Sequence, residues 1–146
     1  MKALQSFLQL FPASIAQAHC DVPCGVYEPD SMTWAAETCF KLVEKMEALE
    51  LPAQDDKHHV LEFHNTMSRS VVIKEEFAQI CKKEALILWT DYFKAEHLDR
   101  WPDLHDKVWN LTKQCSVVKR SVSVVEATKL KEMVAELANI FHETKK

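Results

Sequence analysis

Apolar residues spaced three and four apart along most of the chain limit its fold more than any other feature. From Asp30 onward they recur at these intervals in four separate stretches, and this spacing keeps one face of an α-helix apolar. The chain has a single glycine, and few segments alternate apolar and polar residues as a strand does. The sequence therefore predicts an all-α chain.

The four stretches are separated by short polar or proline-containing connections. We expect a first helix from a cap at Asp30 or Ser31 and a second over roughly residues 58–93. A third follows Pro102, and a capping box of Ser123 with Glu126 opens the fourth. In the first, third and fourth helices the expected core residues are Met32, Ala35, Cys39, Leu42, Met46 and Leu49; Leu104, Val108, Leu111, Cys115 and Val118; and Ala127, Leu130, Val134, Leu137 and Phe141. Four such stripes predict an antiparallel four-helix bundle over residues 30–146.

Composition excludes several classes of partner. A net charge of −4 gives no reason to expect binding to nucleic acid or to an anionic membrane surface. No apolar run reaches the length of about 18 residues that a membrane-spanning helix needs. The five cysteines form an odd number without framework spacing. This pattern favours a reducing compartment, and we expect a cytoplasmic protein.

Residues 19–29 form the most unusual stretch of the chain. His19 stands directly before Cys20, and Pro23, Cys24 and Gly25 follow in succession. Since glycine adopts positive φ without strain, this order predicts a tight turn that returns the Cys24 thiol toward Cys20. Two thiolates select copper, zinc, iron–sulfur clusters or nickel, and a square-planar array of nitrogen and sulfur suits nickel(II) or copper(II).

A cut between Ala18 and His19 would complete the donor set. The α-amine of His19, the amide nitrogen of Cys20 and the two thiolates could then occupy four corners, with the His19 imidazole in an axial position. Without the cut, the His19 nitrogen is an amide and the amine donor is lost.

The run His-Cys-Asp-Val-Pro-Cys-Gly-Val-Tyr from His19 to Tyr27 resembles the metal hook of the nickel-containing superoxide dismutases. Further blocks resemble the same family from residue 19 to the end: Val72-Ile-Lys-Glu-Glu, Leu88-Trp-Thr-Asp-Tyr-Phe-Lys94, His97, Trp101-Pro-Asp-Leu-His105 and the closing Ile-Phe-His-Glu-Thr-Lys-Lys. The resemblance implies one nickel ion per subunit on His19, Cys20 and Cys24. It also implies a homohexamer of four-helix bundles and an enzyme that disproportionates superoxide to oxygen and hydrogen peroxide by cycling between nickel(II) and nickel(III).

The first 18 residues are expected to be a removable leader, cut off by a processing protease. An apolar stripe at helical spacing precedes Ala16-Gln-Ala18, which resembles a small-residue cleavage site. Polar residues interrupt the stripe and only one lysine marks its charged start, so a removable leader is favoured over an export signal. Both readings place the cut before His19.

Tyr27, Tyr92 and Asp21 are expected near the metal, and Lys94 is a further candidate. The resemblance implies that Tyr27 and Tyr92 line a small vestibule whose hydroxyls hold water and restrict entry. Asp21 is expected to fix the hook through hydrogen bonds. Lys94 would either attract the anionic substrate or be an ordinary solvent-exposed lysine.

The sequence also departs from the family pattern around the axial imidazole. A glutamate and an arginine steady that imidazole in the family, and Ala35 and Phe77 stand at the corresponding positions here. Neither can make the hydrogen bond, so Glu37 or Arg69 is a candidate replacement.

Other residues have simpler interpretations. We expect Cys39, Cys81 and Cys115 to be core residues, and His58 and His59 beside Asp55 and Asp56 to form a solvated helix start. The four tryptophans, Trp34, Trp89, Trp101 and Trp109, are expected to pack inside. A function of another class also stays open: a non-catalytic helical module that binds zinc or copper, or carries the thiols, through His19, Cys20 and Cys24.

Overall fold

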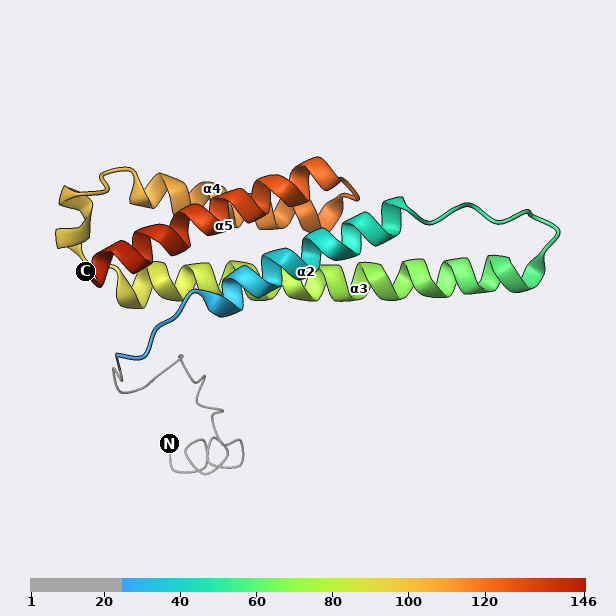
Figure 1. Ribbon diagram of the computed structural model, residues 1–146, viewed down its shortest axis with the longest axis horizontal. Helices are drawn as coiled ribbons and strands as arrows, with labels where there is room; N and C mark the ends of the chain where they lie inside the picture. Colours follow the sequence, from blue (N-terminus) through green and yellow to red (C-terminus); the bar gives the residue numbers. More distant parts are fainter. Residues whose placement is uncertain (1–24) are drawn as a thin grey trace, which may run out of the picture.

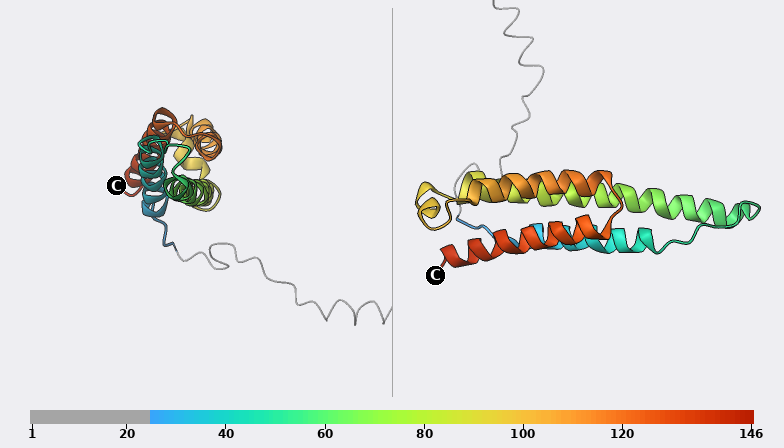
Figure 2. Two further views of the ribbon diagram at one scale, coloured as in Figure 1. Left: turned by 90° about the vertical axis from the view of Figure 1, so that its right-hand side faces the viewer. Right: turned by 90° about the horizontal axis from the view of Figure 1, so that it is seen from above.

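The computed structural model describes residues 25–146 and contains no strand in that range. Its four α-helices are α2 (Asp30–Glu47), α3 (Lys57–Ile87), α4 (Leu104–Arg120) and α5 (Val124–Thr144). A π-helical turn, η1 (Leu88–Tyr92), extends α3, and a 3-10 turn, η2 (Ala95–Asp99), follows it. Each helix packs against two others in the ring α2, α3, α4, α5, and neighbours run in opposite directions (Figures 1 and 2). The expected antiparallel four-helix bundle is confirmed.

The apolar stripes read from the sequence face the core. All the expected core residues of α4 and α5 are buried, as are Met32, Ala35, Cys39 and Met46 of α2. The predicted core of α2 was wrong at two positions. Val43 is buried in place of the half-buried Leu42, and Leu49 lies beyond the end of α2. An α-helix has 3.6 residues per turn, so the next core residue lies either three or four positions on. Choosing the wrong interval places the predicted residue beside the core and not in it.

The start of α5 realises half of the expected capping box. Ser123 Oγ accepts a hydrogen bond from the Glu126 backbone N–H at 3.3 Å. The Glu126 carboxylate, however, accepts from Gln114 Nε2 on α4 at 2.7 Å. The same amide nitrogen donates to the Glu126 carbonyl oxygen at 2.9 Å. The side chain that would close a local box therefore joins two helices.

Lys74 caps the C-terminal end of α4 from the neighbouring helix α3. Its side chain is buried, and Nζ donates to the carbonyl oxygens of Val118, Lys119 and Ser121 at 2.6, 2.8 and 2.6 Å. The last carbonyls of a helix have no partner within it, and an ammonium group has three protons to give. Burial lowers the pKa of Lys74, but the three acceptors and the negative end of the helix dipole favour the charged form.

We expect Lys74→Met to lower the free energy of unfolding by about 3 kcal/mol, because it leaves three carbonyls at the end of α4, all at least partly buried, without their charged donor. Urea unfolding followed by circular dichroism measures the change. Lys83→Met is the matched control, since Lys83 is exposed on the same helix. A loss no larger than that of the control would contradict the capping role.

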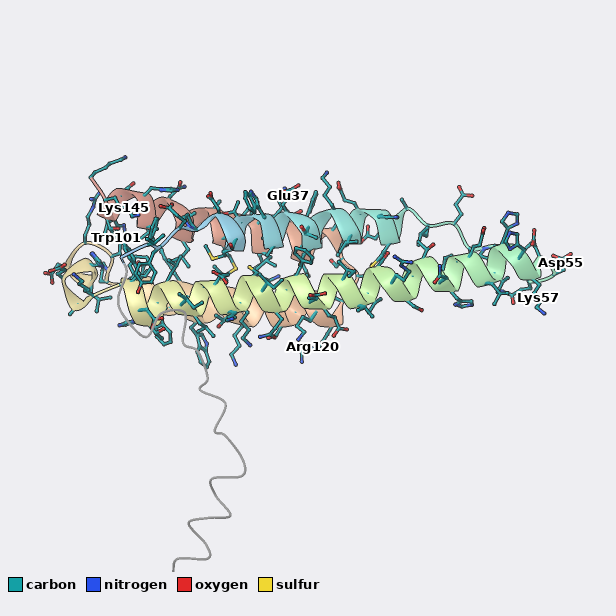
Figure 3. All side chains as sticks on the ribbon, turned by 90° about the horizontal axis from the view of Figure 1, so that it is seen from below. Glu37, Asp55, Lys57, Trp101, Arg120 and Lys145 are labelled. Atoms are coloured by element: carbon teal, nitrogen blue, oxygen red, sulfur yellow. The ribbon has the colours of Figure 1, made fainter. Side chains whose placement is uncertain are left out.

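α3 is much longer than the helices it packs against. It has 31 residues and α4 has 17, and its first turns project past the α4–α5 connection (Figure 1). At its exposed start, labelled by Asp55 and Lys57 in Figure 3, Asp56 accepts from the His59 backbone N–H at 3.2 Å and from His59 Nδ1 at 2.5 Å. The histidine pair therefore marks a solvated helix start, as expected. Among residues 25–146, no helix is both long enough and apolar enough to cross a membrane.

Candidate metal centre and its vestibule

The described part of the hook begins at a glycine whose backbone conformation few other residue types adopt. Gly25, the only glycine, has φ +72°, in the region that glycine adopts without steric cost. The expected positive φ at this glycine is confirmed, whereas the rest of the predicted turn, Pro23 and Cys24, lies outside the described residues. His19, Cys20, Asp21 and Cys24 themselves lie outside the described residues.

The C-terminal end of α5 holds this segment in place. Lys145 Nζ donates to the Tyr27 carbonyl oxygen at 3.2 Å and to Glu28 Oε1 at 3.4 Å. The same ammonium lies 4.5 Å from the centre of the Phe141 ring, a cation–π distance. Lys145 is labelled at the site end of the bundle in Figure 3. The two ends of the described chain therefore meet beside the hook.

A cavity of roughly 450 Å³ opens at this end of the bundle. It is lined by Gly25, Tyr27, Asp91, Tyr92, Lys94, Glu96, His97 and Thr144. The structure thus brings together Tyr27, Tyr92 and Lys94, and the two tyrosine rings lie 5.5 Å apart at 53°. Lys94 lies 3.9 Å from Glu96 and its side chain is 73% exposed. With Asp91 also in the lining, the positive charge of Lys94 is offset.

The π-helical turn sets the direction of Tyr92. Phe93 N donates to the Leu88 carbonyl oxygen at 2.9 Å, five residues back. This wider turn inserts one residue into the helical register just before the cavity, and single π turns are frequent at functional sites. Tyr92 consequently contacts Phe141 of α5, with ring centres 4.6 Å apart.

His97 is a vestibule residue that sequence reasoning missed. Its ring stacks on Tyr92, with centres 5.9 Å apart at 19°. Its Nδ1 accepts from the Lys94 backbone N–H at 3.0 Å, so a neutral His97 carries its proton on Nε2. Two signals in the sequence pointed to His97: its place among the blocks that resemble the family, and its spacing of three from Lys94. Neither signal gives it a place beside Tyr92.

The side chains of Ala35 and Phe77 give an imidazole no polar partner. Ala35 is buried and Phe77 packs partly buried against the core. Cys39 Sγ on α2 lies 3.5 Å from the Lys74 carbonyl oxygen on α3. The two helices run in opposite directions. Ala35, one turn before Cys39, therefore lies beside the residues that follow Phe77.

The two suggested replacements lie elsewhere. Glu37 pairs with Lys131 at 2.6 Å. Arg69 precedes the end of α3 by 18 residues, about 27 Å along the axis. Arg69 is therefore remote from the vestibule of its own subunit.

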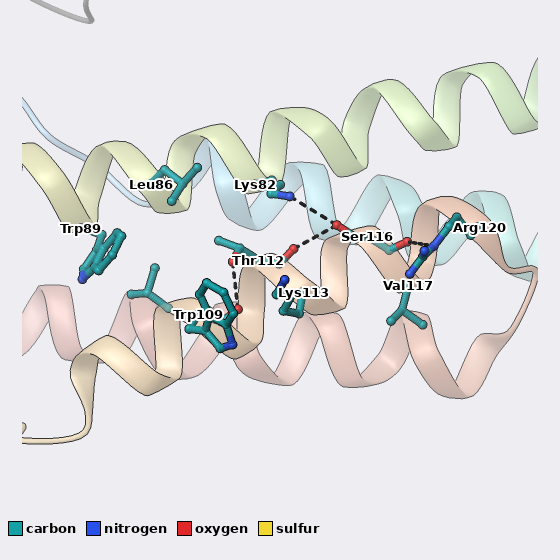
Figure 4. A pocket seen from close by; sticks show the side chains of 10 residues that line it. Lys82, Leu86, Trp89, Trp109, Thr112, Lys113, Ser116, Val117 and Arg120 are labelled. Atoms are coloured by element: carbon teal, nitrogen blue, oxygen red, sulfur yellow. Dashed lines mark hydrogen bonds between the residues drawn. The ribbon is translucent and has the colours of Figure 1, made fainter.

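A larger groove between α3 and α4 has a different character. It measures roughly 500 Å³, and its side chains are drawn in Figure 4. None of the described residues that line it carries a carboxylate, a thiol or an imidazole. Lys82 Nζ and Arg120 Nε donate to Ser116 Oγ and to the Ser116 carbonyl at 3.3 and 3.0 Å. Trp109 on its rim is 59% exposed. This lining offers a metal ion no thiolate, imidazole or carboxylate ligand.

The expectation that all four tryptophans pack inside was wrong for two of them. Trp34 is 68% exposed and Trp109 is 59% exposed. Trp89 and Trp101 do pack partly buried against the core. Trp89 Nε1 also donates to His105 Nδ1 at 2.7 Å.

The three cysteines beyond the hook are core residues, as expected. Cys39, Cys81 and Cys115 are fully buried. Burial raises the pKa of Cys39 to about 12, and a hydrogen bond with Cys115 together with burial raises the pKa of Cys81. The raised pKa values keep the thiols of Cys39 and Cys81 protonated at neutral pH, whereas a metal ligand must be a thiolate. Within residues 25–146 no group of three or more His, Cys, Asp or Glu residues is placed to hold a metal ion.

A family model for nickel-containing superoxide dismutase matches residues 14–145. The chain belongs to this family. It is 36% identical over 135 residues to the nickel superoxide dismutase of Streptomyces coelicolor, and 37% identical to that of Streptomyces seoulensis. Each comparison covers 92% of this chain and 94% of the relative. A solved structure of native nickel superoxide dismutase superposes with a TM-score of 0.74 at 37% identity, over 88% of this chain and all of the other.

Family membership confirms the resemblance drawn from the hook. It assigns the chain to the oxidoreductases that act on superoxide and makes nickel the implied cofactor. The bundle that carries the cavity is thus the family's fold.

Proposed function

We propose that the mature chain disproportionates two superoxide anions, with two protons, into oxygen and hydrogen peroxide. Nickel would be held by His19, Cys20 and Cys24 after a protease removes residues 1–18. The observation that carries the proposal is the placement of the described end of the hook. Gly25 turns at φ +72° directly into a cavity lined by Tyr27 and Tyr92, the two tyrosines that the family resemblance singled out.

The residues of the hook fit nickel by their chemistry. Two thiolates and nitrogen donors from six consecutive residues suit a square-planar nickel site. When bound there, nickel would supply the one-electron exchange that alternately oxidises and reduces superoxide. Cys39 and Cys81 of the bundle do not compete for the metal, because their pKa values are raised and a ligand must be deprotonated.

The chain's own residues would restrict and orient what reaches the metal. The tilted rings of Tyr27 and Tyr92, 5.5 Å apart, narrow the cavity to small molecules and water. Lys145 fixes the backbone between the hook and α2 through the Tyr27 carbonyl. His97 holds a proton on Nε2 within the same lining, and Asp21 would fix the hook through hydrogen bonds.

Assembly and location follow the family resemblance. We propose a homohexamer, and exposed apolar residues beside the hook support a subunit contact there: Val26 is 66% exposed and Trp34 is 68% exposed. Such surface is the kind that protein interfaces cover. The reducing conditions that thiolate ligands need support a cytoplasmic location.

Purification of the trimmed chain tests the function directly. We expect mass spectrometry to find His19 at the amino terminus, metal analysis to find a single nickel ion per chain, and a superoxide assay to show turnover. The same chain loaded with zinc is the control and should be inactive. A trimmed, nickel-loaded chain without activity, or a chain that keeps its leader and takes up zinc, would instead support a non-catalytic metal-binding module.

A further inference from the structure

Tyr92 and Thr144 form a short side-chain contact in the wall of the vestibule. Tyr92 ends the π-helical turn, Thr144 is the last residue of α5, and their oxygens Oη and Oγ1 lie 2.5 Å apart. Both residues line the 450 Å³ cavity. The two residues are 52 positions apart in the chain, so the fold alone creates the contact.

The direction of this hydrogen bond follows from the number of protons available. Thr144 Oγ1 also lies 2.6 Å from the Phe141 carbonyl oxygen, to which it donates. A carbonyl oxygen can only accept, and a threonine hydroxyl has one proton. Thr144 has therefore no proton left for Tyr92. The Tyr92 hydroxyl must donate to Thr144.

The Tyr92 ring cannot turn to choose another partner easily. Aromatic rings surround it, with centres at 4.6 Å for Phe141, 5.2 Å for Phe93, 5.5 Å for Tyr27 and 5.9 Å for His97. Packing of this density holds a side chain in one rotamer. The remaining freedom is rotation of the hydroxyl proton, and Thr144 removes it.

We propose that Thr144 is a positioning residue that holds the hydroxyl proton of Tyr92 out of the vestibule. The phenol oxygen then faces the cavity as an acceptor of hydrogen bonds. Superoxide is an anion and accepts hydrogen bonds, so this phenol oxygen does not bind it directly. The oxygen does accept one O–H of a water molecule. The other O–H of that water is then directed at the substrate. The catalytic part of this inference rests on the proposed function, whereas the proton's direction does not.

A spectroscopic experiment on the folded, metal-free chain tests the direction of the proton. The chain has two tyrosines, so Tyr27→Phe leaves Tyr92 as the only one. Proton NMR follows the phenol proton itself, because a hydroxyl proton held by the fold exchanges slowly with water and one that faces a water-filled cavity exchanges too fast to be seen. We expect a resolved Tyr92 hydroxyl proton, identified by its phenolic chemical shift and its proximity to the Tyr92 ring protons, in the Tyr27→Phe chain and in Tyr27→Phe/Thr144→Ser. Thr144→Val in that background, with Thr144→Ala as a second variant, should remove this resonance.

A second measurement follows turnover in the nickel-loaded enzyme. Thr144→Val should lower kcat/KM about tenfold, and Thr144→Ser should restore it to within about twofold, as expected for one misdirected hydrogen bond. In a Tyr92→Phe background the same Thr144→Val change should have no further effect, because no proton is left to position. This double-mutant comparison separates positioning from a general loss of structure.

Each outcome bears on one claim. A Tyr92 hydroxyl resonance that is absent from the Tyr27→Phe chain, or that persists in both Thr144→Val and Thr144→Ala, would overturn the assigned direction. A Thr144→Val loss of kcat/KM that is equally large in the Tyr92→Phe variant and in the chain that keeps Tyr92 would overturn the positioning role. If the resonance behaves as expected but no nickel-loaded form shows turnover, the proposed function fails while the direction of the Tyr92 proton stands.

Discussion

Cys24→Ser is expected to abolish superoxide dismutation, and Cys20→Ser is expected to do the same. A serine hydroxyl stays protonated at neutral pH and is a hard donor, so it cannot replace the electron-rich thiolate that a nickel(II)/nickel(III) couple requires. The expected result is loss of turnover and of any redox change at the metal. A superoxide assay combined with nickel analysis of the purified variants measures both.

Cys39→Ala is the matched control for these substitutions. Cys39 is fully buried and its pKa is raised to about 12, so its loss removes a thiol without removing a ligand. Nickel content and turnover per nickel should match those of the unsubstituted chain, although the core loses some stability. Activity retained in Cys20→Ser or Cys24→Ser would contradict the assignment of that cysteine as a nickel ligand.

One extra residue ahead of His19 is also expected to eliminate activity. The added peptide bond converts the His19 amine into an amide and moves the new amine out of the five-membered chelate ring. The donor set then lacks a corner of its square plane, so nickel should bind more weakly and fail to cycle. Mass spectrometry to verify the terminus, nickel analysis and a superoxide assay measure the effect.

The control places the same extra residue after Lys146. That position is exposed at the end of the chain, and the variant should keep its nickel and its turnover. Full activity of the amino-terminal extension would show that the α-amine is not a ligand. Removal of the leader would then not be needed to complete the metal site.

The bundle could be predicted from the sequence because burial imposes a period. Leu104 to Val118 and Ala127 to Phe141 repeat at helical spacing, and all their expected core positions are buried. The lone Gly25 likewise indicated a positive φ. Both features depend on the backbone geometry of residues close together in the chain, so the order of residues is enough to predict them.

The vestibule could be predicted only in part, because tertiary contacts build it. Tyr27 and Tyr92 were identified through the family resemblance. Thr144 was not, since it reaches Tyr92 only after α5 packs beside η1. The π-helical turn at Leu88–Tyr92 has no residue signature of its own. Lys74 looked like one residue of a family block, and its role emerged from carbonyls 44 to 47 positions away.

The exposed tryptophans show a limit of another kind. Burial of apolar residues is a one-way rule, because every folded surface retains much apolar area. Trp34 is 68% exposed and Trp109 is 59% exposed, and no spacing in the sequence distinguishes them from the half-buried Trp89.

The bond from Lys145 to the backbone at Tyr27 joins residues 118 positions apart in the chain. It can therefore form only after α5 has been synthesised and has packed into the bundle. In the proposed enzyme, the backbone next to the metal ligands would then be held in place by the folded bundle and not by its own local sequence.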